Sequence, residues 1–237
     1  MKAVILNSGT GSRMGDLTRS RPKCLVDLST GETILSRQIG QIRSCGITDF
    51  IITTGPFEHM IEEYVNATFP GVTVSYIHNP DYRETNYIVS MHLAGGLLRD
   101  EILLLHGDIV TTEDMVRDVI EFAEPNAAVI DSTAGLPADD FKARLVDGLI
   151  TEIGVDVAGS HCVALLPVYS LSRDFMNVWM DEIALLVEAG ELGVYAEEAF
   201  NRRSADLPLS PVDCARRLCM EVDTPEDLEK AMKSIGL

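Results

Sequence analysis

The chain opens with Lys2-Ala3-Val4-Ile5-Leu6-Asn7-Ser8-Gly9-Thr10-Gly11-Ser12-Arg13, an apolar run that leads into a glycine-rich turn. The apolar run predicts a buried first strand. The turn leaves backbone N–H groups free to face an anion, and Arg13 and Lys23 add positive charge beside it. The stretch therefore predicts a nucleotide phosphate site at the carboxyl edge of an α/β sheet.

Two common phosphate-binding motifs do not fit this turn. A dinucleotide fingerprint requires a glycine three residues after Gly11, where this chain has Met14. A Walker loop requires Gly-Lys-Ser/Thr from the same position, where the chain reads Met14-Gly15-Asp16. The turn is therefore of a third kind, or is only a turn.

Repeated alternation of strand and helix patterns extends from this opening through the chain. It predicts a doubly wound, mostly parallel central sheet with helices on both faces. The expected strands are 2–6, 49–54, 72–77, 101–106, 127–130, 163–168 and 218–222. The expected helices are 34–45, 57–67, 85–98, about 171–188 and 194–203, with further helices from 112 and from 224. Asp147-Gly148 lies between two alternating runs and predicts a hairpin, hence a small antiparallel β addition.

The length of 237 residues, with 46% hydrophobic residues, suits one α/β domain over residues 1–237. No apolar run is long enough to cross a bilayer, and the N-terminus reads as a strand rather than a signal peptide. The five cysteines are scattered and form no C-x-x-C pair, which disfavours zinc and disulfide frameworks. We expect a cytoplasmic protein.

The formal charge of −18 disfavours nucleic acid and anionic lipid as partners. The same charge repels a nucleoside triphosphate, so a site for one must reverse the field locally. Arg13, Arg19, Arg21 and Lys23 can do so together with a bound divalent cation.

Two aspartates, Asp108 and Asp223, each follow an expected strand. Strand-end aspartates often serve only in turns or helix caps. Brought to one edge of the sheet, however, two carboxylates can bind Mg²⁺ together with phosphate oxygens. We therefore expect Mg²⁺ as the cofactor.

A second polar segment, Asn79 to Ser90, reads Asn-Pro-Asp-Tyr-Arg-Glu-Thr-Asn-Tyr-Ile-Val-Ser and lies where a strand gives way to a helix. Asn86 can pair with the edge of a base, and Tyr82 offers a ring and a hydroxyl. The planar guanidinium of Arg83 suits phosphate or phosphonate oxygens. A capping Asn and a buried Tyr are the structural alternatives.

These motifs together resemble the nucleotidyltransferases that make sugar- and alcohol-diphosphonucleosides, which have a GT-A-like fold. The resemblance rests on Gly9, Gly11, Arg13 and Pro22-Lys23. It implies that Lys23 and Arg13 are catalytic and that Asp108 and Asp223 bind the metal, with Glu221 as a third candidate. It also implies a set of nucleotide-binding residues: Leu6, Asn7, Ser8, Gly9, Thr10, Gly11, Ser12, Arg13, Lys23, Tyr82, Asn86 and Ser90.

The Asn79–Ser90 segment is similar to that of the phosphocholine and 2-aminoethylphosphonate cytidylyltransferases. This implies CTP and a small phosphate- or phosphonate-bearing acceptor as substrates, and the many acidic residues favour 2-aminoethylphosphonate. The acceptor-binding candidates are Arg83, Asp139, Asp140, Phe141, Tyr195 and Glu198, with Glu197 beside them. Trp179 lies in an apolar helix and is expected in the core.

The first loop departs from the family pattern, because Asn7-Ser8 stand where two alanines are usual. Two other functions remain open. One is a sugar-1-phosphate nucleotidyltransferase with the same core, and the other is a non-catalytic nucleotide-binding regulatory domain.

Overall fold

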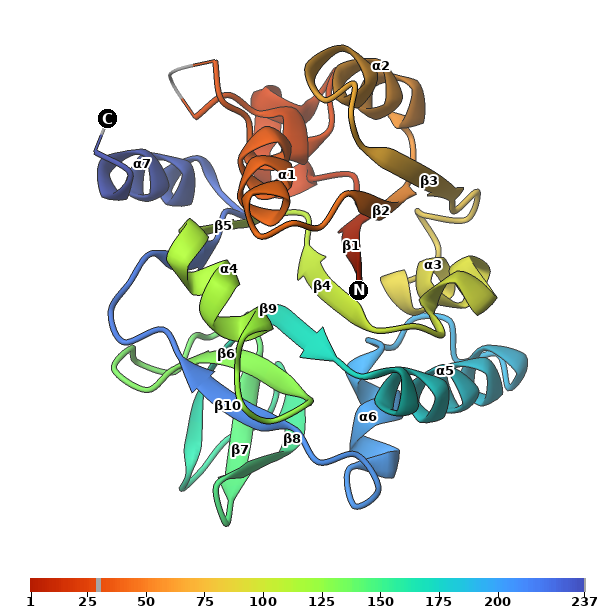
Figure 1. Ribbon diagram of the computed structural model, residues 1–237, viewed down its shortest axis with the longest axis vertical. Coiled ribbons are helices and arrows are strands. Elements are labelled where there is room, and N and C mark those ends of the chain that lie inside the picture. The colour runs from red at the N-terminus through yellow and green to blue at the C-terminus, as the bar shows by residue number, and fades with distance from the viewer. Residues whose placement is uncertain (29–30, 237) are drawn as a thin grey trace.

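The computed structural model describes residues 1–28 and 31–236. Its central sheet has the strand order β10-β6-β9-β4-β1-β2-β3 (Figure 1). The strands are β1 (Lys2–Asn7), β2 (Asp49–Thr54), β3 (Thr73–His78), β4 (Ile102–His106), β6 (Ala127–Asp131), β9 (Cys162–Leu171) and β10 (Ser210–Asp213). β1 runs parallel to β2 and β4, β2 to β3, and β6 to β10. The mostly parallel sheet is confirmed, although β9 runs antiparallel to β4 and β6.

Helices cover both faces of the sheet because the strand residues alternate in direction. Ala3 and Ile5 of β1 pack with α1 (Ile34–Ser44), α2 (Glu58–Thr68) and α4 (Glu113–Ile120). Val4 and Leu6 face the opposite side. There they pack with α3 (Tyr87–Ala94), α5 (Arg173–Glu188) and α6 (Glu197–Arg203). The doubly wound arrangement is therefore confirmed.

Two antiparallel additions flank the parallel strands. β7 (Lys142–Val146) and β8 (Leu149–Gly154) form the expected hairpin, and β7 also pairs with β9. Asp147 (φ 51°) and Gly148 (φ 82°) both adopt positive φ in its turn, as a tight hairpin requires. A separate small sheet pairs β5 (Ile109–Thr111) with β11 (Cys219–Glu221).

Some elements differ from the sequence-based expectation. β5 and β10 were not expected, and the expected strand 218–222 is β11, which pairs with β5 outside the central sheet. The expected 85–98 helix is α3 followed by a short 3₁₀ turn, η3 (Gly95–Leu98), and the helix expected from 194 begins at Glu197. Two further 3₁₀ segments, η1 (Ser12–Thr18) and η2 (Lys23–Leu25), follow the glycine-rich turn.

The last helix, α7 (Pro225–Ser234), begins as expected. The Thr224 side chain accepts from the Asp227 backbone N–H, and Pro225 occupies the first helical position. This cap fixes the chain direction directly after Asp223. Over the described ranges, no helix is both long and apolar enough to span a membrane.

Two glycines let the loops after β1, β2 and β4 approach one another closely. A Cβ at Gly55, after β2, would overlap the backbone carbonyl of Ser8. A Cβ at Gly107, after β4, would overlap the Asn7 side chain. The carboxyl ends of these three strands therefore form one compact edge.

We expect Gly55→Ala to lower the free energy of unfolding by about 2 kcal/mol, because the backbone oxygen of Ser8 cannot yield to a methyl group. The matched control is Gly40→Ala on α1, where an added Cβ meets nothing within 4 Å. That change should raise stability by about 0.5 kcal/mol through helix propensity. Urea denaturation measures both, and equal effects of the two variants would contradict the close approach.

Candidate active site

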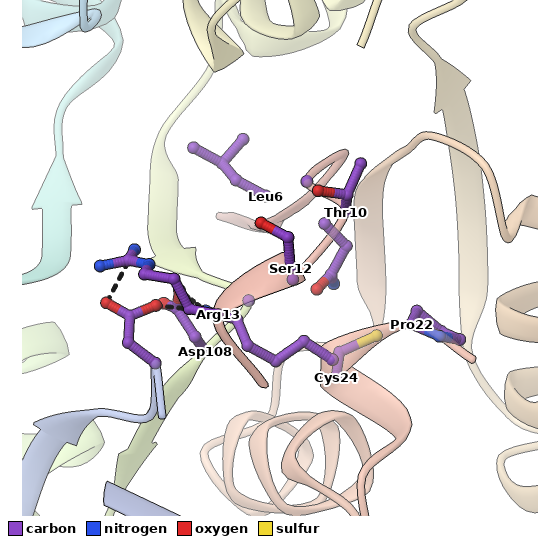
Figure 2. Close-up of a pocket in the computed structure, with 13 residues that line it drawn as sticks. Leu6, Thr10, Ser12, Arg13, Pro22, Cys24 and Asp108 are labelled. Carbon is purple, nitrogen blue, oxygen red and sulfur yellow. Dashed lines mark hydrogen bonds and ion pairs between the residues drawn. The ribbon is translucent and has the colours of Figure 1, made fainter. Parts of the chain in front are cut away.

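The first cavity lies at the carboxyl edge of the sheet and has a volume of about 290 Å³ (Figure 2). Its walls come from the glycine-rich loop after β1, from η2 and from the turn after β4. The lining residues are Leu6, Asn7, Gly9, Thr10, Gly11, Ser12, Arg13, Pro22, Lys23, Cys24, Gly107, Asp108 and Asp223. The structure thus brings together one group of the sequence-derived nucleotide and metal candidates.

Lys23 lies between the two aspartates. Its Nζ donates to Asp108 Oδ2 at 2.6 Å and to Asp223 Oδ1 at 2.7 Å. Arg13 adds a contact of 3.0 Å to the other oxygen of Asp223. Residues 23, 108 and 223 therefore share one ion-pair network, although they are far apart in the sequence.

The charges in this network set the ionisation of its members. Burial works to lower the pKa of Lys23, but Asp108 and Asp223 outweigh it and raise that pKa above its usual value. Burial works to raise the pKa of Asp108, and the Lys23 ammonium reverses that effect and lowers it. Lys23 is therefore a cation and Asp108 an anion at neutral pH.

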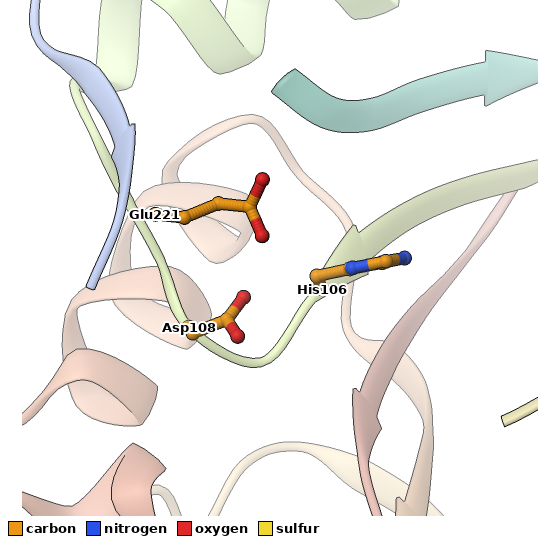
Figure 3. A group of neighbouring side chains, drawn as sticks. All are labelled: His106, Asp108 and Glu221. Atoms are coloured by element: carbon orange, nitrogen blue, oxygen red, sulfur yellow. The ribbon is translucent and has the colours of Figure 1, made fainter. Parts of the chain in front are cut away.

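A denser acidic cluster lies directly beside the ion pair. His106, Asp108 and Glu221 each place a possible ligand atom within 4.8 Å of the others (Figure 3). Burial, followed by the charges of Asp108, Asp140 and Asp223, raises the pKa of Glu221 well above its ordinary value. This corner of the site therefore has more negative charge than its cations offset.

Buried polar atoms without a hydrogen-bond partner lie in the same corner of the site. Within the described residues, Asp108 Oδ1 and His106 Nε2 are buried and have no hydrogen-bond partner. A buried carboxylate oxygen without a donor is costly unless something else binds it. The three nearby carboxylates of Asp108, Glu221 and Asp223 suit a hard divalent cation, which prefers oxygen ligands.

The second cavity, of about 510 Å³, shares Leu6, Gly9 and Asp108 with the first, so the two form one cleft. It contains the candidates from the second polar segment together with Ser8: Tyr82, Arg83, Asn86 and Ser90. Asn86 also caps α3, since its side chain accepts from the Tyr87 N–H at 2.7 Å. The capping role of Asn86 thus leaves its amide nitrogen to face the cavity or the Gly193 carbonyl, which lies 3.4 Å away.

The acceptor candidates fall in different places. Asp139 and Asp140 line a smaller cavity of about 230 Å³ with Arg13, Glu221 and Asp223. Glu198 lines a third cavity and pairs with Arg202 at 3.1 Å.

An aromatic cluster closes one end of the second cavity. The Tyr195 ring lies 4.9 Å from that of Phe141 and 5.9 Å from that of Tyr87, and Tyr87 lies 4.9 Å from His106. Tyr87, His106 and Tyr195 line the second cavity, whereas the buried Phe141 packs against Tyr195 and lines the third cavity. Trp179 is buried in the core, as expected, and its Nε1 donates to the Ala196 carbonyl at 2.9 Å.

Glu197 is the notable residue behind this wall. It is 1% exposed, and it accepts hydrogen bonds from the hydroxyls of Tyr87 and of Tyr169, the latter at 3.0 Å. In the described part of the chain, no ion pair to Glu197 is found. From the sequence, Glu197 was a candidate only together with its neighbours, Tyr87 had no role of its own, and His106 was expected at a strand end, where it lies. The residue pattern carries no signal for a buried glutamate that faces two tyrosines.

Several known proteins are similar to this chain in sequence. The CMP-5'-(3-aminopropyl)phosphonate synthase of Streptomyces rubellomurinus is 30% identical over 153 residues, which are 64% of this chain and 24% of that protein. The CTP:phosphoglutamine cytidylyltransferase of Campylobacter jejuni is 25% identical over 169 residues, or 65% of each chain. The chain thus spans less than two thirds of the length of these relatives.

Comparison with solved structures gives the same fold. The CTP:phosphocholine cytidylyltransferase of Streptococcus pneumoniae superposes with a TM-score of 0.79 over 99% of this chain and 98% of its own, at 19% identity. The family model of the MobA-like NTP transferase domain matches residues 3–175, which is more than half of the chain. The chain belongs to the family of MobA-like NTP transferase domains.

Proposed function

We propose that the protein is a cytidylyltransferase that moves CMP from CTP to a small amine-bearing phosphonate or phosphate and releases pyrophosphate. The observation that carries the proposal is Lys23, held between Asp108 and Asp223 beneath the glycine-rich loop. Three similar proteins support an acceptor of this class: a CMP-5'-(3-aminopropyl)phosphonate synthase, a CTP:phosphoglutamine cytidylyltransferase and a CTP:phosphocholine cytidylyltransferase.

The chain's own residues supply the phosphate chemistry. Loop residues 9–13 offer backbone N–H groups and the Arg13 guanidinium to the β- and γ-phosphates. Lys23 neutralises the charge that develops on the α-phosphate. An acceptor oxygen attacks the α-phosphorus, the new P–O bond forms, and the bond to the β-phosphate oxygen breaks. The attacking oxygen is already an anion, so positioning and charge stabilisation suffice without a general base.

We propose Mg²⁺ as the cofactor. The fit rests on the orphaned Asp108 Oδ1 and on the surplus of carboxylates at Glu221 and Asp223. When bound, the ion supplies charge neutralisation for the triphosphate. Asp108, Asp223 and Glu221 would hold it, while Lys23 is free to turn toward the α-phosphate.

The acceptor's amine fits the aromatic wall. Tyr195 and Tyr87 offer ring surfaces to the second cavity, and the carboxyl group of the buried Glu197 lies behind them, in contact with the Tyr87 hydroxyl. Ring faces and a nearby carboxylate both attract an ammonium group. Glu197 supports a primary amine, and 2-aminoethylphosphonate is the favoured acceptor over phosphocholine.

The first experiment incubates the protein with CTP, Mg²⁺ and either 2-aminoethylphosphonate or phosphocholine. Pyrophosphate release gives the rate, and phosphorus NMR identifies the new phosphoanhydride linkage. We expect Lys23→Ala and Asp108→Asn each to lower kcat by at least about 100-fold, because each removes charge that acts on the transition state. Lys230→Ala and Asp181→Asn, both on exposed helical surface, are the matched controls.

Full turnover by a folded Asp108→Asn variant would remove Asp108 from the mechanism. Turnover with dTTP or UTP and a sugar 1-phosphate, but not with CTP, would favour the sugar nucleotidyltransferase. Tight CTP binding without pyrophosphate release from any acceptor would favour a regulatory domain.

A second experiment tests the metal site without turnover. In the nucleotide-free protein, the Lys23 ammonium lies where it neutralises both carboxylates. We expect Lys23→Met to raise the affinity for Mn²⁺ at least about tenfold, since a unit charge about 4 Å away is worth more than 1 kcal/mol at a protein surface. Electron paramagnetic resonance of free Mn²⁺ measures this, with Lys230→Met as control. Unchanged or weaker Mn²⁺ binding would count against the metal site.

A third experiment tests the amine subsite. We expect Glu197→Gln to raise KM about fivefold for 2-aminoethylphosphonate and to leave KM for ethylphosphonate, which lacks the amine, near its original value. Glu188→Gln, on an exposed end of α5, is the control. An equal rise of KM for both acceptors would mean that Glu197 only supports the packing of the wall.

A further inference from the structure

A relay of three buried polar side chains ends at Ser8, in the wall of the second cavity. Asn79 Nδ2 donates to Ser90 Oγ at 3.1 Å, and Ser90 Oγ donates to Ser8 Oγ at 2.9 Å. The three residues are 1%, 0% and 7% exposed. They come from three segments: the end of β3, helix α3 and the glycine-rich loop.

The backbone fixes the direction of the donors in this relay. The Asp81 N–H donates to Asn79 Oδ1 at 3.0 Å, so the Asn79 amide presents its Nδ2 to Ser90. Ser90 accepts from that amide and directs its single hydroxyl hydrogen to Ser8. Ser8 therefore accepts from Ser90 and retains its own hydrogen for another acceptor.

Among the described residues, no acceptor for this hydrogen is found. Over the described ranges, the recorded bond of the Ser8 hydroxyl is the one it accepts from Ser90. Ser8, Asn79 and Ser90 all line the second cavity, beside Tyr82 and Asn86. A buried hydroxyl donor without an acceptor is costly, so a ligand that brings an acceptor to this wall gains affinity.

The backbone at Ser8 is held in place. Its carbonyl lies so close to Gly55 that no side chain fits there. The Ser8 hydroxyl is therefore oriented before any ligand arrives.

We infer that Ser8 is a specificity-determining residue whose hydroxyl donates to N3 of cytosine, so that the site selects CTP over UTP. This inference rests on the proposed function, because it assigns the Ser8 end of the second cavity to the base of the nucleotide and leaves the aromatic end to the acceptor. Ring atom N3 is an acceptor in cytosine and carries a hydrogen in uracil. With uracil, two donors face each other, and the Ser8 hydrogen is left without a partner. A site built to pair with one group rejects the analogue that lacks it.

The test compares CTP with UTP in each protein variant. We expect Ser8→Ala to lower kcat/KM for CTP about tenfold and to leave that for UTP unchanged, so that the CTP/UTP ratio falls about tenfold. We expect Ser90→Ala to leave the Ser8 hydroxyl free to rotate. The kcat/KM for UTP should then rise, and the CTP/UTP ratio should fall. Ser44→Ala, on exposed helix surface, keeps both values.

Calorimetric titration with each nucleotide gives the same ratio from binding alone. It tests Ser8 even if no acceptor is turned over, which separates a failure of this inference from a failure of the proposed activity. Equal losses for CTP and UTP in Ser8→Ala would show a merely structural role. An unchanged ratio in both serine variants would overturn the inference.

Discussion

The ion pair of Lys23 with Asp108 and Asp223 is the interaction on which the rest of the site depends. Its 2.6 and 2.7 Å contacts join η2, the turn after β4 and the segment before α7. Asp108 and Asp223 lie 85 and 200 positions from Lys23 in the sequence, so these opposite charges meet only because the fold brings them together. The parallel pairing of β1 with β4 brings the glycine-rich loop and Asp108 to the same edge, and the small β5–β11 sheet brings Asp223 there. The sheet topology thus determines where the charge is concentrated.

The same edge of the sheet carries more carboxylates than cations. Lys23 and Arg13 face Asp108, Asp223, Glu221 and Asp140, so the carboxylates exceed the cations. Burial and then the neighbouring carboxylates raise the pKa of Glu221, and Asp108 Oδ1 has no hydrogen-bond partner among the described residues. This excess supports the proposal that a divalent cation binds together with a triphosphate. The cation would neutralise the carboxylates, and the triphosphate would pair with Lys23 and Arg13. The same site disfavours a bare triphosphate, which is repelled by the carboxylates.

At each end of the cleft, hydrogen bonds from neighbouring side chains hold a buried polar group in a fixed orientation. At one end, the hydroxyls of Tyr87 and Tyr169 donate to the buried Glu197 and hold its carboxyl group behind an aromatic surface. At the other, Asn79 and Ser90 orient the hydroxyl of Ser8. In each case a buried polar group is positioned by partners before a ligand binds, which lowers the cost of ordering it later. Buried networks of this kind favour selectivity, because a wrong ligand leaves a polar group unpaired.

Elements whose signals lie in neighbouring residues could be predicted from the sequence. The apolar run before Gly9, the Asp147-Gly148 turn and the Thr224-Pro225 helix start each depend on neighbouring residues, and each is found as expected. The position of Asp108 after a strand was also predicted from the sequence. Only the tertiary structure decided that β5 pairs with β11, that Glu197 faces two tyrosines and that Ser8 ends a relay from Asn79. These contacts join residues tens of positions apart or more, and no periodicity along the chain encodes which distant side chains will meet once the sheet has closed over its core.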